Sequence, residues 1–221
     1  MELDIVRHPR ARRAKLAVDP ASGRARLTLP PRAALRPALA WAREHEEWIE
    51  AQRARLPRAR PFVDGATVPF GDSELVISWS PDAPRRVERE AERLVVGGPA
   101  DTIARRVTAW LKREALDLLS ADTAHYAGLA GVKVSGVAIG DPRGRWGSCA
   151  GTGAIRYSWR LVMAPLHVRR ATAAHEVAHR VHMNHGPAFH ALVAELYGAD
   201  PRLARQWLRE HGAALHWLGR E

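Results

Sequence analysis

The stretch Ala174-His-Glu-Val-Ala-His-Arg-Val-His-Met-Asn-His-Gly-Pro187 is the most informative part of the sequence. Residues on a helix advance by about 100° each, so His175 and His179 lie about 40° apart on one face, where both imidazoles can reach a single metal ion. Glu176 lies at the flank of this pair, where its carboxylate can take a proton from a water molecule held at the metal. The pattern His-Glu-x-x-His therefore predicts a helix that carries two metal ligands and a general base.

A catalytic zinc site usually has three protein ligands, so the sequence must supply a third. Four residues are candidates. His182 lies on the same face if the helix continues, but three imidazoles on consecutive turns reach one tetrahedral ion with difficulty. His185 reaches the metal only if the helix ends before it, which the neighbouring Asn, Gly and Pro residues favour. Glu195, on the next predicted helix, is a third candidate, and His190 is the fourth.

The residues around the two histidines are small and apolar, which indicates that the helix is buried. His-Glu-x-x-His also arises by chance on helices, but burying these side chains without a partner is costly. A metal ion supplies the partner. The chain has one cysteine, Cys149, which excludes thiolate-rich zinc sites and any disulfide within the chain. We therefore predict a Zn²⁺ site that is held by histidines and carboxylates.

Outside this stretch, the apolar periodicity predicts an α+β chain with a β-rich N-terminal half. The predicted strands cover residues 14–18, 25–29, 67–70, 74–79, 93–96, 132–139, 145–149 and 154–159, with a bulge or kink at Gly136. The predicted helices cover residues 33–52, 166–183, 187–197 and 201–215, with approximate bounds. A further long helix is predicted after Asp101, which caps it, and carries an apolar stripe from Ile103 to Leu119.

The predicted elements group into two halves. Residues 1–98 hold most of the strands and one helix, and residues 99–221 hold the metal-binding part; we expect both to form one unit. Antiparallel pairing is expected for the three strands between 67 and 96, since short turns separate them. The proline-rich segment 57–61 is typical of a linker.

Charge is distributed unevenly along the chain. The chain has 34 Lys and Arg residues against 24 Asp and Glu, a net charge of +10. Residues 1–60 alone hold 14 basic against 7 acidic residues, which favours an anionic partner such as a nucleic acid or nucleotide. No segment approaches the roughly 18 apolar residues of a membrane span, and no targeting pattern is present at the start. We expect a soluble, cytoplasmic protein without a membrane partner.

Five blocks of the sequence share their order and spacing with one known family: Arg145-Trp-Gly-Ser-Cys149, Ile155-Arg-Tyr-Ser-Trp-Arg-Leu161, Ala164-Pro165, His175-Glu-Val-Ala-His179 and Asn184-His-Gly-Pro-Ala-Phe189. In this combination the chain resembles the YgjP-like metallopeptidase family, which is related to SprT-like and minigluzincin proteins. Residues 11–15 and 30–32 resemble the front end of the family, so the likeness covers most of the chain. The resemblance implies that the third ligand is His185. The family usually has Trp after the Phe of the last block, where this chain has His190.

The resemblance also implies a zincin-like α+β fold, in which a mixed or antiparallel sheet packs on the active-site helix. The hairpin that contains Trp146 and Trp159 would then lie near the metal, and its edge strand would be able to pair with an extended peptide. Core packing is the favoured interpretation of Trp146, Trp159 and Cys149. An alternative for Cys149 is that its thiol approaches the zinc as a redox-sensitive inhibitor.

The leading functional hypothesis is a zinc-dependent metallopeptidase acting on a peptide or protein, in which His175, His179 and His185 bind Zn²⁺ and Glu176 is the general base. A first alternative is hydrolysis of a nucleoside triphosphate or another phosphoanhydride, with phosphates held by nearby arginines: Arg143, Arg145, Arg156 and Arg160. A second alternative is a nucleic-acid-binding module with a structural metal, which the basic N-terminal segment and the DNA-associated SprT-like relatives favour.

Overall fold

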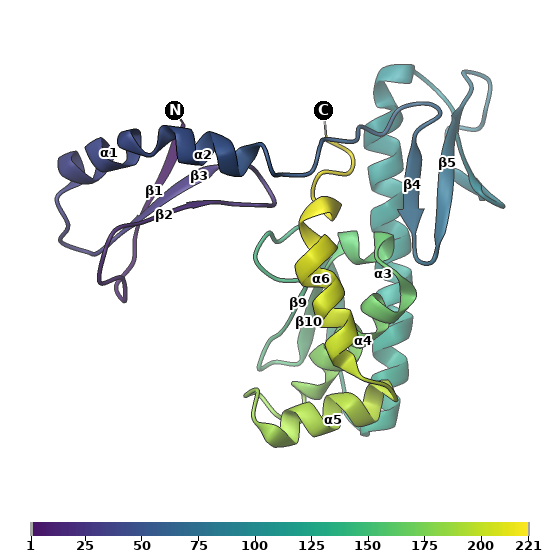
Figure 1. Cartoon of the computed structure of the whole chain (residues 1–221). Coiled ribbons are helices and arrows are strands. Elements are labelled where there is room, and N and C mark those ends of the chain that lie inside the picture. The colour runs from purple at the N-terminus through teal and green to yellow at the C-terminus, as the bar shows by residue number, and fades with distance from the viewer. Residues whose placement is uncertain (1, 221) are drawn as a thin grey trace. The chain divides into compact units, whose positions relative to one another are not determined.

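The computed structural model describes residues 2–220, and the contacts within the chain divide it into two compact units, Met1–Arg58 and Ala59–Glu221 (Figure 1). The division falls inside the proline-rich segment 57–61, which the sequence predicts as a linker. It lies before the predicted boundary at residue 98, because the strands between 67 and 96 share a hydrophobic core with the long helix of the second unit. That residues 1–98 and 99–221 are the two parts of one family unit stays a prediction.

The first unit contains a three-stranded sheet in the order β1-β3-β2. Its strands are β1 (Leu3–Arg7), β2 (Lys15–Val18) and β3 (Ala25–Leu29). The antiparallel pairing of β2 with β3 confirms the predicted hairpin. The sequence prediction missed β1, which pairs with β3 in parallel. The sequence of β1 does not alternate regularly between apolar and polar residues, so it gives no clear strand signal. The last three residues of β1 are exposed.

Two helices follow this sheet where the sequence predicts one. These are α1 (Leu35–Glu44) and α2 (Glu46–Arg53). They separate at His45, whose backbone leaves the helical region with φ −104° and ψ 19°. The buried side chains of Leu27 and Leu29 from β3 and Ala42 from α1 form the small core of this unit.

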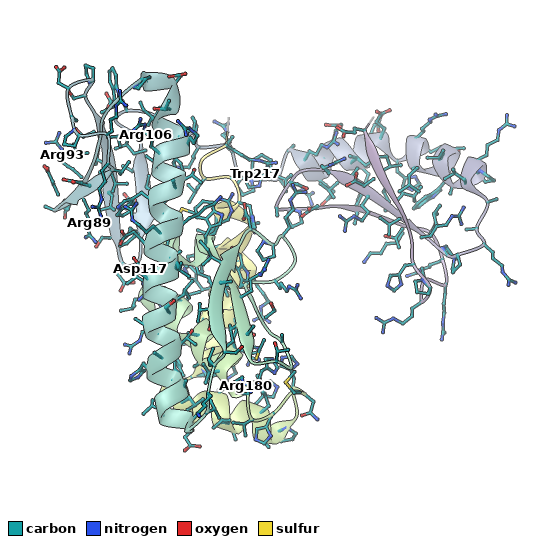
Figure 2. All side chains as sticks on the ribbon, turned by 180° about the vertical axis from the view of Figure 1, so that it is seen from behind. Arg89, Arg93, Arg106, Asp117, Arg180 and Trp217 are labelled. Carbon is teal, nitrogen blue, oxygen red and sulfur yellow. The ribbon has the colours of Figure 1, made fainter. Side chains whose placement is uncertain are left out.

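The second unit opens with a four-stranded sheet in the order β4-β5-β7-β6. Its strands are β4 (Thr67–Phe70), β5 (Ser73–Trp79), β6 (Glu88–Glu90) and β7 (Arg93–Val96). The expectation of purely antiparallel pairing was wrong, because β5 and β7 are parallel. Strand β6, which the sequence prediction missed, lies between β5 and β7 in the sequence. In the sheet it is an edge strand, and its three residues are exposed. Arg89 and Arg93 lie on this sheet in Figure 2.

Helix α3 (Ile103–Ala130) is the longest element of the structure. It carries the predicted apolar stripe, and Val107, Leu111 and Leu119 are fully buried. The predicted cap by Asp101 was wrong. Residues Ala100–Thr102 form a short 3₁₀ turn (η1), and no side chain caps the start of α3. The helix ends at Gly131, whose φ of 63° is in the left-handed region that favours glycine.

A second small sheet lies beside helix α4 (Leu166–Ala178), which carries His175 and Glu176. It contains β8 (Gly136–Gly140), β9 (Gly147–Cys149) and β10 (Ala154–Ser158) in the order β8-β10-β9. The sheet is mixed, because β10 is parallel to β8 and antiparallel to β9. The β9–β10 hairpin confirms the prediction, whereas β8 starts only at Gly136, where the alternation of the sequence changes phase. In this order β9 is an edge strand, and it contacts α4.

The last third of the chain is helical, as predicted. After a 3₁₀ segment, η2 (Trp159–Met163), it contains α4 (Leu166–Ala178), α5 (Pro187–Tyr197) and α6 (Pro201–Leu215). The predicted continuation of α4 to residue 183 was wrong. The amides of Arg180 and Val181 donate to carbonyls three residues back, 2.8 and 3.0 Å away. This tightening is typical of a helix end.

The structure is therefore a mixed α+β fold with small sheets, as the sequence predicts, and one mixed sheet contacts α4. This architecture is compatible with a metallopeptidase domain, and the zincin-like arrangement stays a prediction. Within residues 2–220, none of the helices combines the length and the apolar character that a membrane crossing requires.

Candidate metal centre

Three histidines meet at the end of α4. His175 comes from its last turn, His179 is the first residue after it, and His185 comes from the loop that leads into α5. One ring nitrogen of each lies within 4.8 Å of the other two. Among residues 2–220, no other group of three His, Cys, Asp or Glu side chains converges in this way. The structure thus brings together the three histidines that the family resemblance selects.

The separation of His175 and His185 fits two ligands of a tetrahedral metal ion. The Nε2 atoms of His175 and His185 are 3.3 Å apart. Zinc–nitrogen bonds of about 2.0–2.1 Å at tetrahedral angles place two ligands about 3.3–3.4 Å apart. The Nδ1 atom of His179 lies 3.1 Å from the carbonyl oxygen of His182. Because that oxygen can only accept, Nδ1 donates, and Nε2 of His179 is left to bind the metal.

The other three candidates lie outside this cluster. His182 contributes its carbonyl oxygen and not its ring, because α4 ends before it and the chain has left the helix face. His190 is exposed, and its ring centre is 6.3 Å from that of His185. Glu195 is exposed on α5 and takes no part in the group.

Phe189 packs against all three imidazoles. It is fully buried, and its ring centre lies 4.9 Å from that of His175, 4.5 Å from that of His179 and 4.8 Å from that of His185. This contact restricts the orientations that the three rings can adopt. Sequence reasoning did not assign this role to Phe189, although Phe189 closes the block Asn184-His-Gly-Pro-Ala-Phe189 that also contains His185.

Glu176 is buried beside the histidines, with 5% of its surface exposed. Its carboxylate lies against the backbone of Gly147 on β9, so closely that a Cβ atom at position 147 would come within 2.7 Å of Cγ and Cδ of Glu176. Burial raises the pKa of Glu176 to about 7, and the positive charge of Arg145 opposes this rise. Edge strand β9 therefore fixes the position of this carboxylate.

Burial favours the neutral form of two imidazoles of the site, those of His175 and His179. Burial lowers the pKa of His175 to about 4, with smaller contributions from His179, His185 and Arg205. Burial also lowers the pKa of His179. Neutral imidazole is the form that binds a metal ion. The site is thus prepared for a cation at neutral pH.

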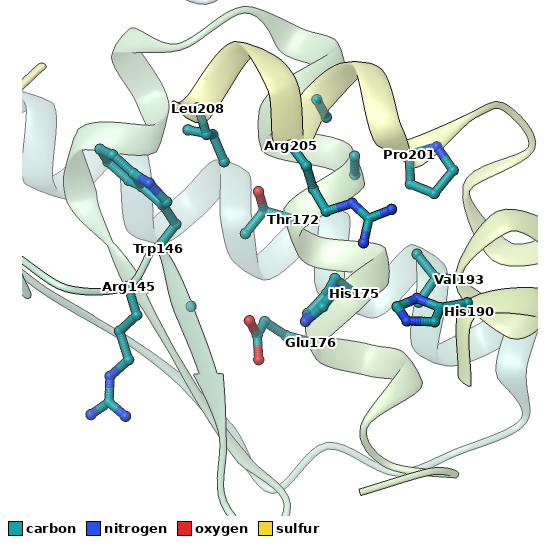
Figure 3. Close-up of a pocket in the computed structure, with 13 residues that line it drawn as sticks. Arg145, Trp146, Thr172, His175, Glu176, His190, Val193, Pro201, Arg205 and Leu208 are labelled. Atoms are coloured by element: carbon teal, nitrogen blue, oxygen red, sulfur yellow. The ribbon is translucent and has the colours of Figure 1, made fainter. Parts of the chain in front are cut away.

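A cavity of about 220 Å³ opens directly beside His175 and Glu176 (Figure 3). Helices α4, α5 and α6 and the residues at the start of β9 form its walls. A cavity of this volume accepts about one side chain, since sites for drug-sized ligands measure roughly 300–1,000 Å³.

Core packing, predicted for the aromatic residues of the hairpin next to the site, holds for one of the two tryptophans. Trp159 is buried in the core, whereas Trp146 is half-buried and lines the cavity. Cys149 is half-buried on β9, and burial raises the pKa of its thiol.

At the turn of this hairpin, Arg180 donates hydrogen bonds of 3.2 Å to the carbonyl of Lys133 and 3.5 Å to that of Gly151 (Figure 2). The turn is thereby tied to the end of α4.

Arg160, one of the four arginines that the phosphoanhydride alternative would use to hold phosphates, is not available for that role. It is 9% exposed and forms two hydrogen bonds with the carboxylate of Asp141, at 2.8 and 3.1 Å. It also donates to the carbonyls of Leu215 and Leu218 at 2.6 and 3.2 Å. Arg160 therefore anchors the end of α6. Arg143, Arg145 and Arg156 are exposed.

Three histidines that converge on one point beside a buried carboxylate, within an α+β fold, form the arrangement of a metal-dependent hydrolase. The sequence model of the YgjP-like metallopeptidase domain matches residues 12–211, so the chain belongs to the YgjP-like metallopeptidase family. The resemblance found in the sequence is confirmed, and the family implies a metal ion, typically zinc. No curated protein and no solved structure matches the chain.

Proposed function

We propose that this protein is a zinc metallopeptidase in which His175, His179 and His185 bind Zn²⁺ and Glu176 is the general base. The observation that carries the proposal is the meeting of three imidazoles with a buried carboxylate beside a free strand edge. A His-only ligand set leaves a fourth position of a tetrahedral ion for water or substrate, as catalytic zinc sites require.

The free edge of β9 supports a peptide as the substrate. The amide of Ser158 donates to the carbonyl of Trp146 at 2.8 Å, and the amide of Ala150 donates to that of Ala154 at 2.9 Å. Since every second residue of an antiparallel strand bonds to its neighbour, the main-chain groups of Gly147 and Cys149 point away from β10. An extended peptide that pairs with this edge would pass next to Glu176, which contacts Gly147.

Bound zinc supplies Lewis acidity and lowers the pKa of water towards about 7. Glu176 accepts a proton on a carboxylate oxygen as water attacks the peptide carbonyl carbon. It then donates this proton to the nitrogen of the leaving amine as the C–N bond breaks. The contact with Gly147 holds the carboxylate in place for both transfers, and its burial restricts the loss of the proton to bulk water.

The two alternatives have less support. A phosphoanhydride substrate loses Arg160 as a clamp, because that guanidinium is committed to Asp141. A nucleic acid or nucleotide bound through the basic residues of 1–60 stays a prediction, as does a cytoplasmic location.

The test compares the zinc-loaded wild type with Glu176→Gln on casein, on a quenched peptide library and on ATP. We expect cleavage of casein or peptides by the wild type alone, with equal zinc content in both proteins. Full hydrolysis by Glu176→Gln would contradict the proposed mechanism, and release of phosphate without peptide cleavage would favour the phosphoanhydride alternative. For the ligands, we expect zinc content to fall sharply in His185→Ala and much less in His182→Ala; the reverse result would overturn the assignment.

A further inference from the structure

The cavity beside the metal centre is suited to the aliphatic part of one substrate side chain. Most of its wall is apolar, with Val193 from α5 and Leu208 from α6 among the lining residues. Small residues, Ala171 on α4 and Ala204 on α6, leave space between these helices. The hydroxyl of Thr172, which also lines the cavity, donates to a carbonyl within its own helix. The shape and lining therefore favour a methylene chain.

Arg205 brings a positive charge to this apolar space. It extends from α6, and its guanidinium points towards the space between His175 and His190 (Figure 3). The structure records no ion pair between Arg205 and any residue of 2–220. The nearby carboxylate of Asp200 instead accepts from Nε of Arg202, at 2.9 and 3.0 Å. Arg205 is exposed, and its charge helps Arg202 to lower the pKa of Asp200. Within residues 2–220 no ion pair holds its guanidinium, so the guanidinium is available to a ligand.

The cavity itself offers this charge no counterion. Glu176 is the one carboxylate among the lining residues, and it lies against Gly147 on the side of β9. The other cationic lining residue with a permanent charge, Arg145, extends away from the cavity in Figure 3. A guanidinium binds a carboxylate with two parallel hydrogen bonds, which are strong and specific in geometry. The chemistry that completes the cavity is a carboxylate.

We propose that this cavity binds a substrate residue that carries a carboxylate, and that Arg205 is the residue that determines this specificity. The proposal rests on the proposed peptidase function. The methylene groups of the substrate residue pack between Val193 and Leu208, and its carboxylate pairs with the guanidinium of Arg205. Two sources can supply this chemistry, a glutamate side chain within a peptide and the free carboxylate of a peptide's C-terminus.

The first experiment measures the preference for glutamate over glutamine, which differ in charge and hardly in size. A peptide mixture that varies the residue type at each position around the cleaved bond is first digested by the wild type and by Arg205→Glu. The position at which the two proteins select different residues is identified. Two peptides that differ only by Glu or Gln at that position are then compared. We expect the zinc-loaded wild type to favour Glu about tenfold in kcat/KM. Arg205→Gln should abolish the preference and Arg205→Glu should invert it. Arg209→Glu, an exposed residue of the same helix outside the cavity, should retain it.

A second arm distinguishes the two sources of the carboxylate. Peptides that end at the selected position are prepared with a free and with an amidated C-terminus. If the C-terminus is the recognised group, amidation lowers kcat/KM about tenfold and Arg205→Gln removes the difference. If the glutamate side chain is recognised, amidation has no effect and the Glu over Gln preference persists.

A third arm keeps this proposal separate from the proposed function. Binding of the capped amino acids Ac-Glu-NH₂ and Ac-Gln-NH₂ to zinc-loaded Glu176→Gln protein is measured by NMR titration, which needs no turnover. Tighter binding of Ac-Glu-NH₂ that Arg205→Glu removes would support the cavity assignment even if no peptide is cleaved. Ac-Gln with a free C-terminal carboxylate is titrated alongside them to cover the second source. Equal affinities of all three compounds, no binding of any of them, or a preference for a carboxylate that Arg205→Glu leaves unchanged would overturn the assignment.

Discussion

Replacing Gly147 by alanine tests whether the strand edge positions the general base. The added Cβ would lie 2.7 Å from Cγ and Cδ of Glu176, whereas ordinary contact begins at 3.4 Å. The Glu176 side chain must therefore move by at least about 0.7 Å, and a misplacement of about 1 Å can lower a rate by 10²-fold. We expect kcat to fall by about 10- to 100-fold, an increase in the activation free energy of about 1.4–2.7 kcal/mol.

The assay follows cleavage of a quenched peptide together with zinc content and thermal unfolding. Zinc content should stay at the wild-type level, because the substitution touches none of the three histidines. The matched control is Gly151→Ala in the turn of the same hairpin, where an added Cβ meets no atom within 4 Å. Activity of Gly147→Ala within twofold of the Gly151→Ala control would refute the reasoning, and loss of zinc would show that the damage extends beyond Glu176.

Three further predictions concern stability. Zinc at 100 times its Kd should stabilise the wild type by about 2.7 kcal/mol and raise its Tm, with little effect on His185→Ala, as differential scanning calorimetry would show. Thr123→Val should lower the free energy of unfolding by about 1–3 kcal/mol in urea titrations, because the hydroxyl of the buried Tyr157, 2.9 Å from Oγ1 of Thr123, loses its partner. Asp122→Ala should cost about 3–5 kcal/mol in the same assay, because it leaves the buried guanidinium of Arg169 unpaired.

Double variants provide the controls for the two buried pairs. Adding Tyr157→Phe to Thr123→Val, or Arg169→Met to Asp122→Ala, should recover most of the lost stability, because neither partner then remains unsatisfied. Double variants that are as unstable as the sum of their single changes would show that packing and not the pair interaction explains the losses. A Tm increase with zinc in His185→Ala equal to that of the wild type would contradict the ligand assignment.

Local signals in the sequence predicted much of the fold. Helices α5 and α6 start at Pro187 and Pro201, and the Asp200 side chain accepts from the amide of Arg202, so their boundaries were predictable. The end of α4 at Ala178 was not, because no glycine or proline follows it there. Likewise, the parallel pairing of β5 with β7 depends on the route of the chain in space and not on any local pattern.

The residues of the candidate site also fall into two groups, those that local spacing predicts and those that depend on contacts between distant segments. His175, Glu176 and His179 follow from helical spacing alone, whereas the selection of His185 needed the family resemblance. The roles of Gly147 and Arg205 depend on contacts between distant segments: β9 lies against α4, and α6 brings Arg205 to the cavity wall. A single sequence contains no period or spacing that reports such contacts.

The end of α4 between two of the histidines has a consequence for local stability. Residues 179–186 contain neither helix nor strand, and His185 at the end of this segment is exposed. An ion bound by both His175 and His185 would close this short loop as a crosslink does. The free energy of metal binding would then stabilise the ordered conformation of residues 179–186. The order of this segment should then follow zinc supply, so amide exchange and proteolytic cleavage within 179–186 would report zinc occupancy while the rest of the unit stays folded.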